Sequence, residues 1–278
     1  MNEWELVQDM VSKGDLMDPA VRIMPLFAVL LSRLFPIVYL SFFLGARLLP
    51  MPVKVFIALS LFIYMIPDML IKATDLTFGA NLLAFIFKEM FVGIILGTMI
   101  SVPNYVVMLA GMVIDHQRGA SSLMISNSIT SVQDSPLGML FNYILTYFYW
   151  YYDVPFTYFE AIALSYQVIP IDVFLSPHLF SFDSNLYIQL RDVFSQLFAL
   201  GIQLAAPSLV IIVMIDMFLG ITNRLAPQVM ISFLAQGLKA MLGLTVLYLG
   251  WYYIMGVFAA ESKRWAEFVY QWVHTIPY

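Results

Sequence analysis

Four residues with chemically active side chains, Asp115, His116, Gln117 and Arg118, stand side by side in the stretch GMVIDHQRGASS, directly after a long apolar run. Such groups can transfer protons, bind a metal or form ion pairs. Nucleophilic catalysis needs an activated nucleophile beside a base, but the chain has three histidines, no cysteine and no serine elbow motif. No local motif marks Asp115 and Asp216 as a catalytic pair. We therefore expect no enzyme activity.

Metal, cofactor and nucleic-acid chemistry is not supported either. No two histidines are spaced for one helix face, and neither an HExxH nor a Walker-type run is present. The absence of cysteine excludes disulfides and thiolate metal sites. The formal charge of −5 leaves no basic stripe to neutralise phosphates. We expect no metal, no cofactor and no nucleic-acid partner.

The composition is that of an integral membrane protein. Of the 278 residues, 62% are hydrophobic and 11% are charged, and the mean hydropathy is +0.86. A helix needs about 20 apolar residues to cross a bilayer. About seven apolar stretches meet or approach this length: 22–49, 53–71, 81–110, 137–152, 156–171, 194–222 and 236–260. They predict an all-α, polytopic membrane protein, and no linker or repeat divides residues 1–278 into more than one domain.

Prolines inside these stretches, among them Pro36, Pro103 and Pro207, predict kinked or broken helices. Lipid cannot satisfy the freed backbone groups, so such breaks must lie against protein or a wet cavity. The acidic N-terminal 20 residues lack a basic region followed by an apolar core, and we expect no cleavable signal peptide.

A ridge of small residues headed by a carboxylate occurs in KEMFVGIILGTMIS. Its members, spaced four apart, are Glu89, Gly93, Gly97 and Ser101. Such ridges let helices approach closely, either within one subunit or between subunits. A carboxylate in an apolar span is costly and needs a partner, for which Lys88 and Arg33 are candidates.

A second ridge comprises Asp216, Gly220 and Arg224, on a helix that Pro227 should end. In one interpretation Asp216 pairs elsewhere in the same bundle and Arg224 extends to the membrane interface, while two polar residues satisfy the last carbonyls. These two residues are Asn223 and Gln228. In the other interpretation the ridge is a buried contact with another subunit.

The segment from Gly111 to Pro136 is rich in Gly, Ser, Asn and Thr and is poorly suited to hydrocarbon. It is predicted to be a loop or broken helix, either on the surface or lining a water-filled passage. Isolated charges and broken helices also occur in secondary transporters and channels for small solutes, which remains the alternative function.

Three motifs occur along the chain: KEMFVGIILG, then AGMVIDHQRGAS followed by DSP, then LAAPSLVIIVMIDMFLGITNRLAPQVMISF. In this order they resemble the type III secretion export-apparatus family, SctT and SpaR in injectisomes and FliR in flagella. The likeness covers most of the chain, with Arg33 in an early span and Lys239 near the end. Arg118 is similar to injectisome members, since flagellar ones usually have methionine there. Asp216 stands where the family often has Glu, a conservative change.

The resemblance implies a pore component of the bacterial inner membrane. Family members assemble with the small subunits SctR and SctS into an export gate, near the switch protein SctU and the large protein SctV, and unfolded effector chains pass through it. The segment 111–136 is expected to help plug the passage. Gly111 and Gly119 can provide hinges, and Asp115, Gln117 and Arg118 can hold the closed form, with Arg118 paired to a carboxylate.

Overall fold

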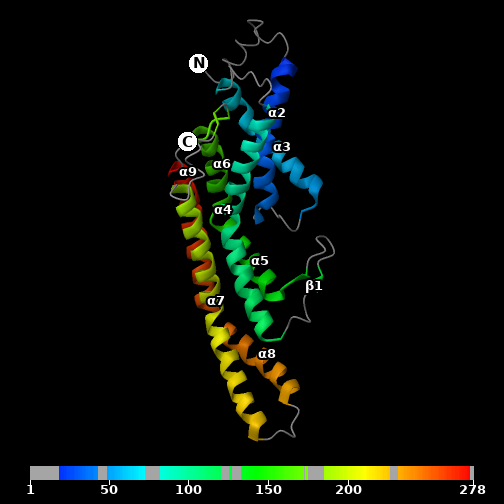
Figure 1. Ribbon diagram of the computed structural model, residues 1–278, viewed down its shortest axis with the longest axis vertical. Helices are drawn as coiled ribbons and strands as arrows, with labels where there is room; N and C mark the ends of the chain where they lie inside the picture. Colours follow the sequence, from blue (N-terminus) through cyan, green and yellow to red (C-terminus); the bar gives the residue numbers. More distant parts are fainter. Residues whose placement is uncertain are drawn as a thin grey trace. The chain divides into compact units, whose positions relative to one another are not determined.

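The computed structural model describes residues 19–42, 49–72, 82–119, 125–126, 133–171, 173–174, 185–225 and 231–275 (Figure 1). Each predicted apolar stretch contains a helix, because a continuous apolar run satisfies its backbone groups internally as it leaves water. The helices are α2 (Pro19–Leu40), α3 (Met51–Lys72), α4 (Leu82–Gln117), α5 (Pro136–Tyr151), α6 (Val154–Val168), α7 (Asn185–Leu225), α8 (Ile231–Leu249) and α9 (Trp251–Thr275).

The only extended pairing in the described residues is an antiparallel ladder of two residues per strand, β1 (Ile125–Ser126) and β2 (Gln133–Asp134). It lies between α4 and α5 in the chain, with Ile125 opposite Asp134 and Ser126 opposite Gln133. The prediction of an all-α membrane protein is confirmed, since this short ladder is a feature of one connection rather than a sheet.

Length and composition single out the helices that could cross a bilayer. Of the described helices, α4 with 36 residues and the Tyr187–Leu225 part of α7 qualify by length and composition, and a bent α8–α9 pair would make a third span. That pair is bent by 60° near Gly250. The three named prolines do not end their helices, because α2 continues through Pro36, α4 through Pro103 and α7 through Pro207.

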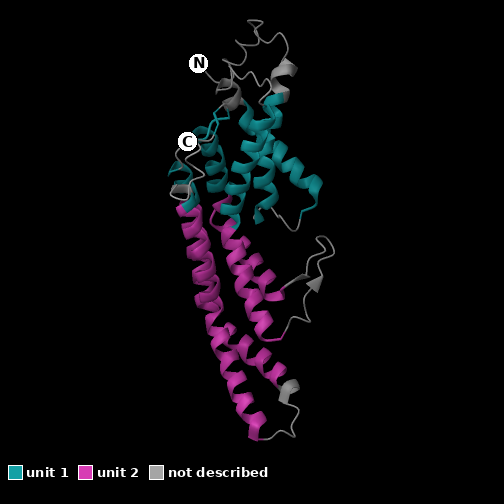
Figure 2. Cartoon of the chain, viewed as in Figure 1, with its two compact units in different colours: residues 1–101, 156–187, 269–278 teal, residues 102–155, 188–268 magenta. Residues whose placement is uncertain are grey.

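The chain divides into two compact units, which Figure 2 colours separately. Unit 1 consists of Met1–Ser101, Phe156–Tyr187 and Val269–Tyr278, and its core includes the buried face of α2 with Leu30, Leu34 and Ile37. Unit 2 consists of Val102–Pro155 and Ile188–Phe268. In its core Phe141 of α5 packs edge-on against Phe258 of α9, with ring centroids 5.6 Å apart. Nothing in the sequence signals this division.

Candidate functional site

The polar segment of unit 2 begins where α4 ends. Helix α4 continues to Gln117, and the amides of Arg118 and Gly119 bond to the carbonyls of Ile114 (3.0 Å) and His116 (3.1 Å). Gly119 has a φ of +80°, a conformation in which glycine commonly ends a helix because it has no Cβ. We call Arg118 and Gly119, where the chain leaves α4, the first foot of the connection to α5.

The expectation that the loop begins at Gly111 is wrong. Gly111 and Asp115 lie buried in the last two turns of α4, and Gln117 is exposed at its end. The apolar run continues through Ile114, which is fully buried, so the helix gains packing by extending past Gly111. The connection itself is residues 118–135, of which 120–124 and 127–132 lie outside the described residues.

The second foot is the start of α5. Ser135 is the N-cap, and its Oγ accepts a hydrogen bond of 3.0 Å from the Gly138 amide. Pro136 follows at the first helical position, where its missing N–H costs nothing and its fixed φ suits the helix. Ser-Pro is thus a local helix-start signal, and it fixes where the connection ends.

One carboxylate holds the two feet together. Asp115 is 2% exposed; its Oδ1 accepts from Arg118 Nε at 2.8 Å and pairs with Nη2 at 2.5 Å. Its Oδ2 accepts from Ser135 Oγ at 2.5 Å and from the Leu137 amide at 2.9 Å. Charge-assisted hydrogen bonds of this kind are stronger than neutral ones. We call Asp115, Arg118, Ser135 and the Leu137 amide the Asp115 clamp.

Gly111 contributes to the clamp by close packing. A Cβ at Gly111 would collide with the backbone of Gly138 and Leu137, so glycine lets α4 and α5 approach at this level. A Cβ at Gly138 would in turn meet the Met108 carbonyl oxygen at 3.0 Å. Gly111 is therefore a packing residue inside a helix. A hinge at Gly111 would therefore lie within α4 and not at the start of the connection.

A residue that the sequence did not indicate, Gln236 of α8, also reaches the first foot. Its Nε2 donates to the Gly119 carbonyl oxygen at 2.8 Å. The two residues are 117 positions apart, and Gln236 belongs to no recognisable motif. Only the fold brings them together.

The second ridge lies on α7. Asp216 forms an ion pair with Lys239 of α8, and its side chain is 47% exposed. In the described residues, no atom outside the adjoining helix backbone lies within 4 Å of a Cβ built at Gly220, and Asn223 and Arg224 are exposed at the end of the helix. Asp216 thus pairs with a residue of its own chain, as in the first interpretation, and contact of this ridge with another subunit stays a prediction. Pro227 and Gln228, predicted to follow, lie outside the described residues.

In unit 1 the Glu89 carboxylate is fully buried and meets both predicted cations. Arg33 Nε pairs with Oε2, Arg33 Nη2 donates to Oε1 at 2.9 Å, and Lys88 Nζ lies 2.7 Å from Oε1. The expectation that Glu89 meets Arg33 or Lys88 is confirmed for both. Two buried cations share one buried carboxylate, so the remaining donors need other acceptors.

Backbone carbonyls at and after the C-terminus of α6 provide those acceptors. Arg33 donates to the carbonyls of Ser165 at 2.8 Å and Ile169 at 2.9 Å. Lys88 donates to three more carbonyls, at 2.8, 3.1 and 3.0 Å: Pro170, Ile171 and Val173. Cations near a helix C-terminus are favoured by its dipole and by its unpaired carbonyls. This cluster therefore ties α2 and α4 to the end of α6.

The small-residue ridge of α4 packs against α2 within unit 1. A Cβ at Gly93 would collide with the backbone of Arg33, and one at Gly97 would lie 3.1 Å from the Pro36 carbonyl oxygen. At the end of the ridge, Ser101 Oγ donates to the Leu40 carbonyl at 2.7 Å. All four ridge members thus face α2, in helix packing inside one chain.

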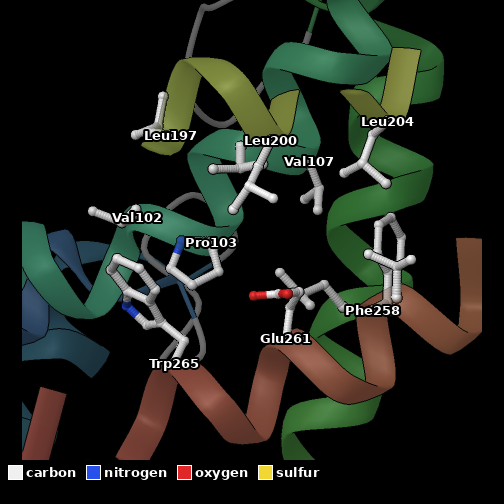
Figure 3. A pocket seen from close by; sticks show the side chains of 12 residues that line it. Val102, Pro103, Val107, Leu197, Leu200, Leu204, Phe258, Glu261 and Trp265 are labelled. Carbon is white, nitrogen blue, oxygen red and sulfur yellow. The ribbon is translucent and has the colours of Figure 1, made fainter. Parts of the chain in front are cut away.

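Unit 2 also contains an apolar pocket between α4, α5, α7 and α9, shown in Figure 3. Aliphatic and aromatic side chains line it, and its one acidic residue, Glu261, pairs with Arg264 at 3.1 Å. In the part of the chain that the structure describes, no three acidic or histidine side chains are grouped for a metal ion.

Comparison with known proteins agrees with the motifs around these sites. Residues 24–265 match the family described as bacterial export proteins, family 1. The secretion system apparatus protein SsaT of Salmonella typhimurium is 26% identical over 188 residues, 68% of this chain and 71% of SsaT. The surface presentation of antigens protein SpaR of Shigella flexneri is 25% identical over 67% of this chain and 72% of SpaR.

A third relative, the Yop proteins translocation protein T of Yersinia pestis, is 26% identical over 66% of this chain and 67% of its own length. The family match spans both units and includes the Asp115 clamp, the Glu89 cluster and the Asp216–Lys239 pair. The chain belongs to the bacterial export proteins of family 1, the type III secretion family of SctT, SpaR and FliR, and is of the injectisome type.

Proposed function

We propose that this chain is a structural subunit of the type III secretion export gate in the bacterial inner membrane, and that the connection from Arg118 to Ser135 helps to plug the passage. Unfolded effector polypeptides would be the cargo. The partners would be SctR and SctS in the gate itself, with SctU and SctV beside it. Membership of an export family supports the general role, and the Asp115 clamp supports the plug.

The physical requirement for such a plug is that it opens without dismantling the protein. A gate that passes arbitrary unfolded sequence needs weak contacts with its cargo and an element of low local stability. The Asp115 clamp meets this requirement, because it fixes both feet of the connection to the ends of α4 and α5. The segment between the feet can then move aside while the two helices stay together.

In this proposal, the pairing of Arg118 within the clamp helps to hold the plug closed. In the structure Arg118 is 8% exposed and its carboxylate partner is Asp115, three positions earlier on the same chain. Loss of the Arg118 charge would leave Asp115 buried with only neutral donors, which weakens the hold on the second foot as well. The plug would then open more often.

The test is charge removal at the clamp in cells that assemble the apparatus. Arg118→Gln and Asp115→Asn should raise ion leakage across the inner membrane, while export of a secreted substrate persists or becomes less regulated. Arg191→Gln, which removes an exposed charge on α7 that pairs with its neighbour Asp192, is the matched control. The plug proposal is sunk if Arg118→Gln leaves both leakage and secretion unchanged while the chain accumulates normally.

The assembly is tested separately by native mass spectrometry. The tagged chain, co-expressed with the neighbouring membrane-protein genes and extracted in mild detergent, should appear in one discrete complex with several copies of small partner subunits. A chain that appears alone, despite confirmed expression of those neighbours, would contradict the gate proposal. Stabilisation by a small solute would then favour a transporter.

A further inference from the structure

The α7–α8 hairpin contacts the first foot of the connection through one described side-chain hydrogen bond, from Gln236 Nε2 to the Gly119 carbonyl. The contact is close, since a Cβ built at Gly119 would lie 3.1 Å from the same amide nitrogen. The positive φ of Gly119 turns the chain out of α4 at this point. The first foot therefore touches α8 at the residue where its backbone leaves the helix.

Near Gln236, α8 also contacts α7. Lys239, one turn further along α8, pairs with Asp216. Ile215 and Leu219 of α7 form a small buried cluster, and three apolar side chains of α8 pack against it: Ala235, Leu238 and Leu242. In Figure 1 these two helices lie side by side within unit 2. Helix α8 is thus held to α7 by apolar packing and an ion pair, and to the first foot by Gln236.

We propose that Gln236 is a latch that couples the position of the α7–α8 hairpin to the first foot at Gly119, and so regulates the plug. This inference rests on the proposed function. The Asp115 clamp joins the feet to each other, whereas Gln236 joins them to a different element. If a contact on the exposed face of α7 shifted the hairpin, Gln236 would transmit this shift to the first foot.

The chemistry of the two contacts suits this division of roles. The clamp is buried and charge-assisted, while the Gln236 bond is a single neutral hydrogen bond at an exposed position. A neutral bond of this kind contributes little net stability, so it can break and re-form without unfolding the unit. Gln236 is a positioning residue, acting on the plug only through Gly119.

The latch is tested with two substitutions that remove the donor. Gln236→Met keeps the length of the side chain and removes the amide donor. Gln236→Glu also removes the donor, and it places a charged acceptor against the Gly119 carbonyl oxygen. Gln203, an exposed glutamine on α7, gives the matched controls Gln203→Met and Gln203→Glu. Hydrogen exchange of the peptide containing Gly119 is measured in the purified complex, and ion leakage in cells. We expect exchange to rise about two- to tenfold in both Gln236 variants and leakage to rise with it, with neither change in the controls.

The latch is overturned if both Gln236 variants exchange like their Gln203 counterparts. Its regulatory part is overturned if exchange rises but leakage does not, while Asp115→Asn in the same cells does leak. If Asp115→Asn and Arg118→Gln do not leak either, the plug proposal fails, and regulation through the latch fails with it. The three outcomes are distinguishable because exchange reports the contact and leakage reports the passage.

Discussion

The Arg33 guanidinium of α2 and the Glu89 carboxylate of α4 form a fully buried, two-pronged ion pair across 56 positions of sequence. Lys88 shares the same carboxylate, so this cluster holds one more positive than negative charge. The excess is stabilised by backbone carbonyls at and after the end of α6, which makes the pair a junction of three helices.

Removal of the shared carboxylate should be strongly destabilising. Glu89→Gln leaves two buried cations without a counter-charge, and the loss of one member of a buried pair costs about 3–5 kcal/mol. We expect the variant complex to aggregate at a clearly lower temperature in mild detergent, or the chain not to accumulate. Asp192→Asn breaks an exposed pair instead and should change stability by less than about 1 kcal/mol. Equal stability of the two variants would contradict the junction.

Gly93→Ala tests the close contact of α4 with α2. The added methyl group would collide with the Arg33 backbone, which cannot move without disturbing the Glu89 pair. Overpacking of this kind costs about 1–3 kcal/mol. Gly256→Ala on α9 is the control, because in the described residues no atom outside the adjoining helix backbone lies within 4 Å of its Cβ position, and alanine favours a helix by up to about 1 kcal/mol. Equal thermal stability of the two variants would contradict the packing of this ridge against α2.

Gly111→Ala should affect the clamp as well as stability. The new methyl group would push α5 away at Gly138 and lengthen the bonds from Asp115 to Ser135 and Leu137. Leakage should therefore increase at a temperature where the complex is still assembled. Gly237→Ala on α8 has open space around its Cβ position and should behave like the unaltered chain. If the Gly111→Ala complex leaked no more ions than the unaltered one, the spacing of α4 and α5 would not control the plug.

Local signals in the sequence account for much of the fold. The apolar stretches predict the helices, because each stretch must lie either in the protein core or against lipid along its length. Gly119, Ser135 and Pro136 are local end and start signals that would have placed the connection at 118–135. A boundary at Gly111 follows from composition alone, and the apolar residues up to Ile114 contradict it.

Contacts across long sequence separations could not be predicted in the same way. Glu89 needed a cation and Arg33 was an available one, so that pair followed from charge and burial. The carbonyls that satisfy Lys88 follow α6, more than 80 positions away, and no side-chain pattern marks them. Gln236 is an ordinary polar residue until the fold places it 2.8 Å from the Gly119 carbonyl. Such contacts depend on how helices pack, which a single sequence does not specify locally.

Charge reversal at Asp216 and Lys239 separates packing inside the chain from contact with another subunit. The pair joins α7 to α8 in the structure, and both side chains are partly exposed, at 47% and 20%. Partly exposed pairs contribute about 0–1 kcal/mol, so either single charge removal should change thermal stability slightly. Asp216→Lys and Lys239→Asp each bring like charges together and should weaken the hairpin more, whereas the double reversal should restore it. Recovery is measured as assembly of the native complex and its resistance to heat. If Asp216 instead met a cation of another subunit, the double reversal would leave that cation opposite a lysine, and assembly would not recover.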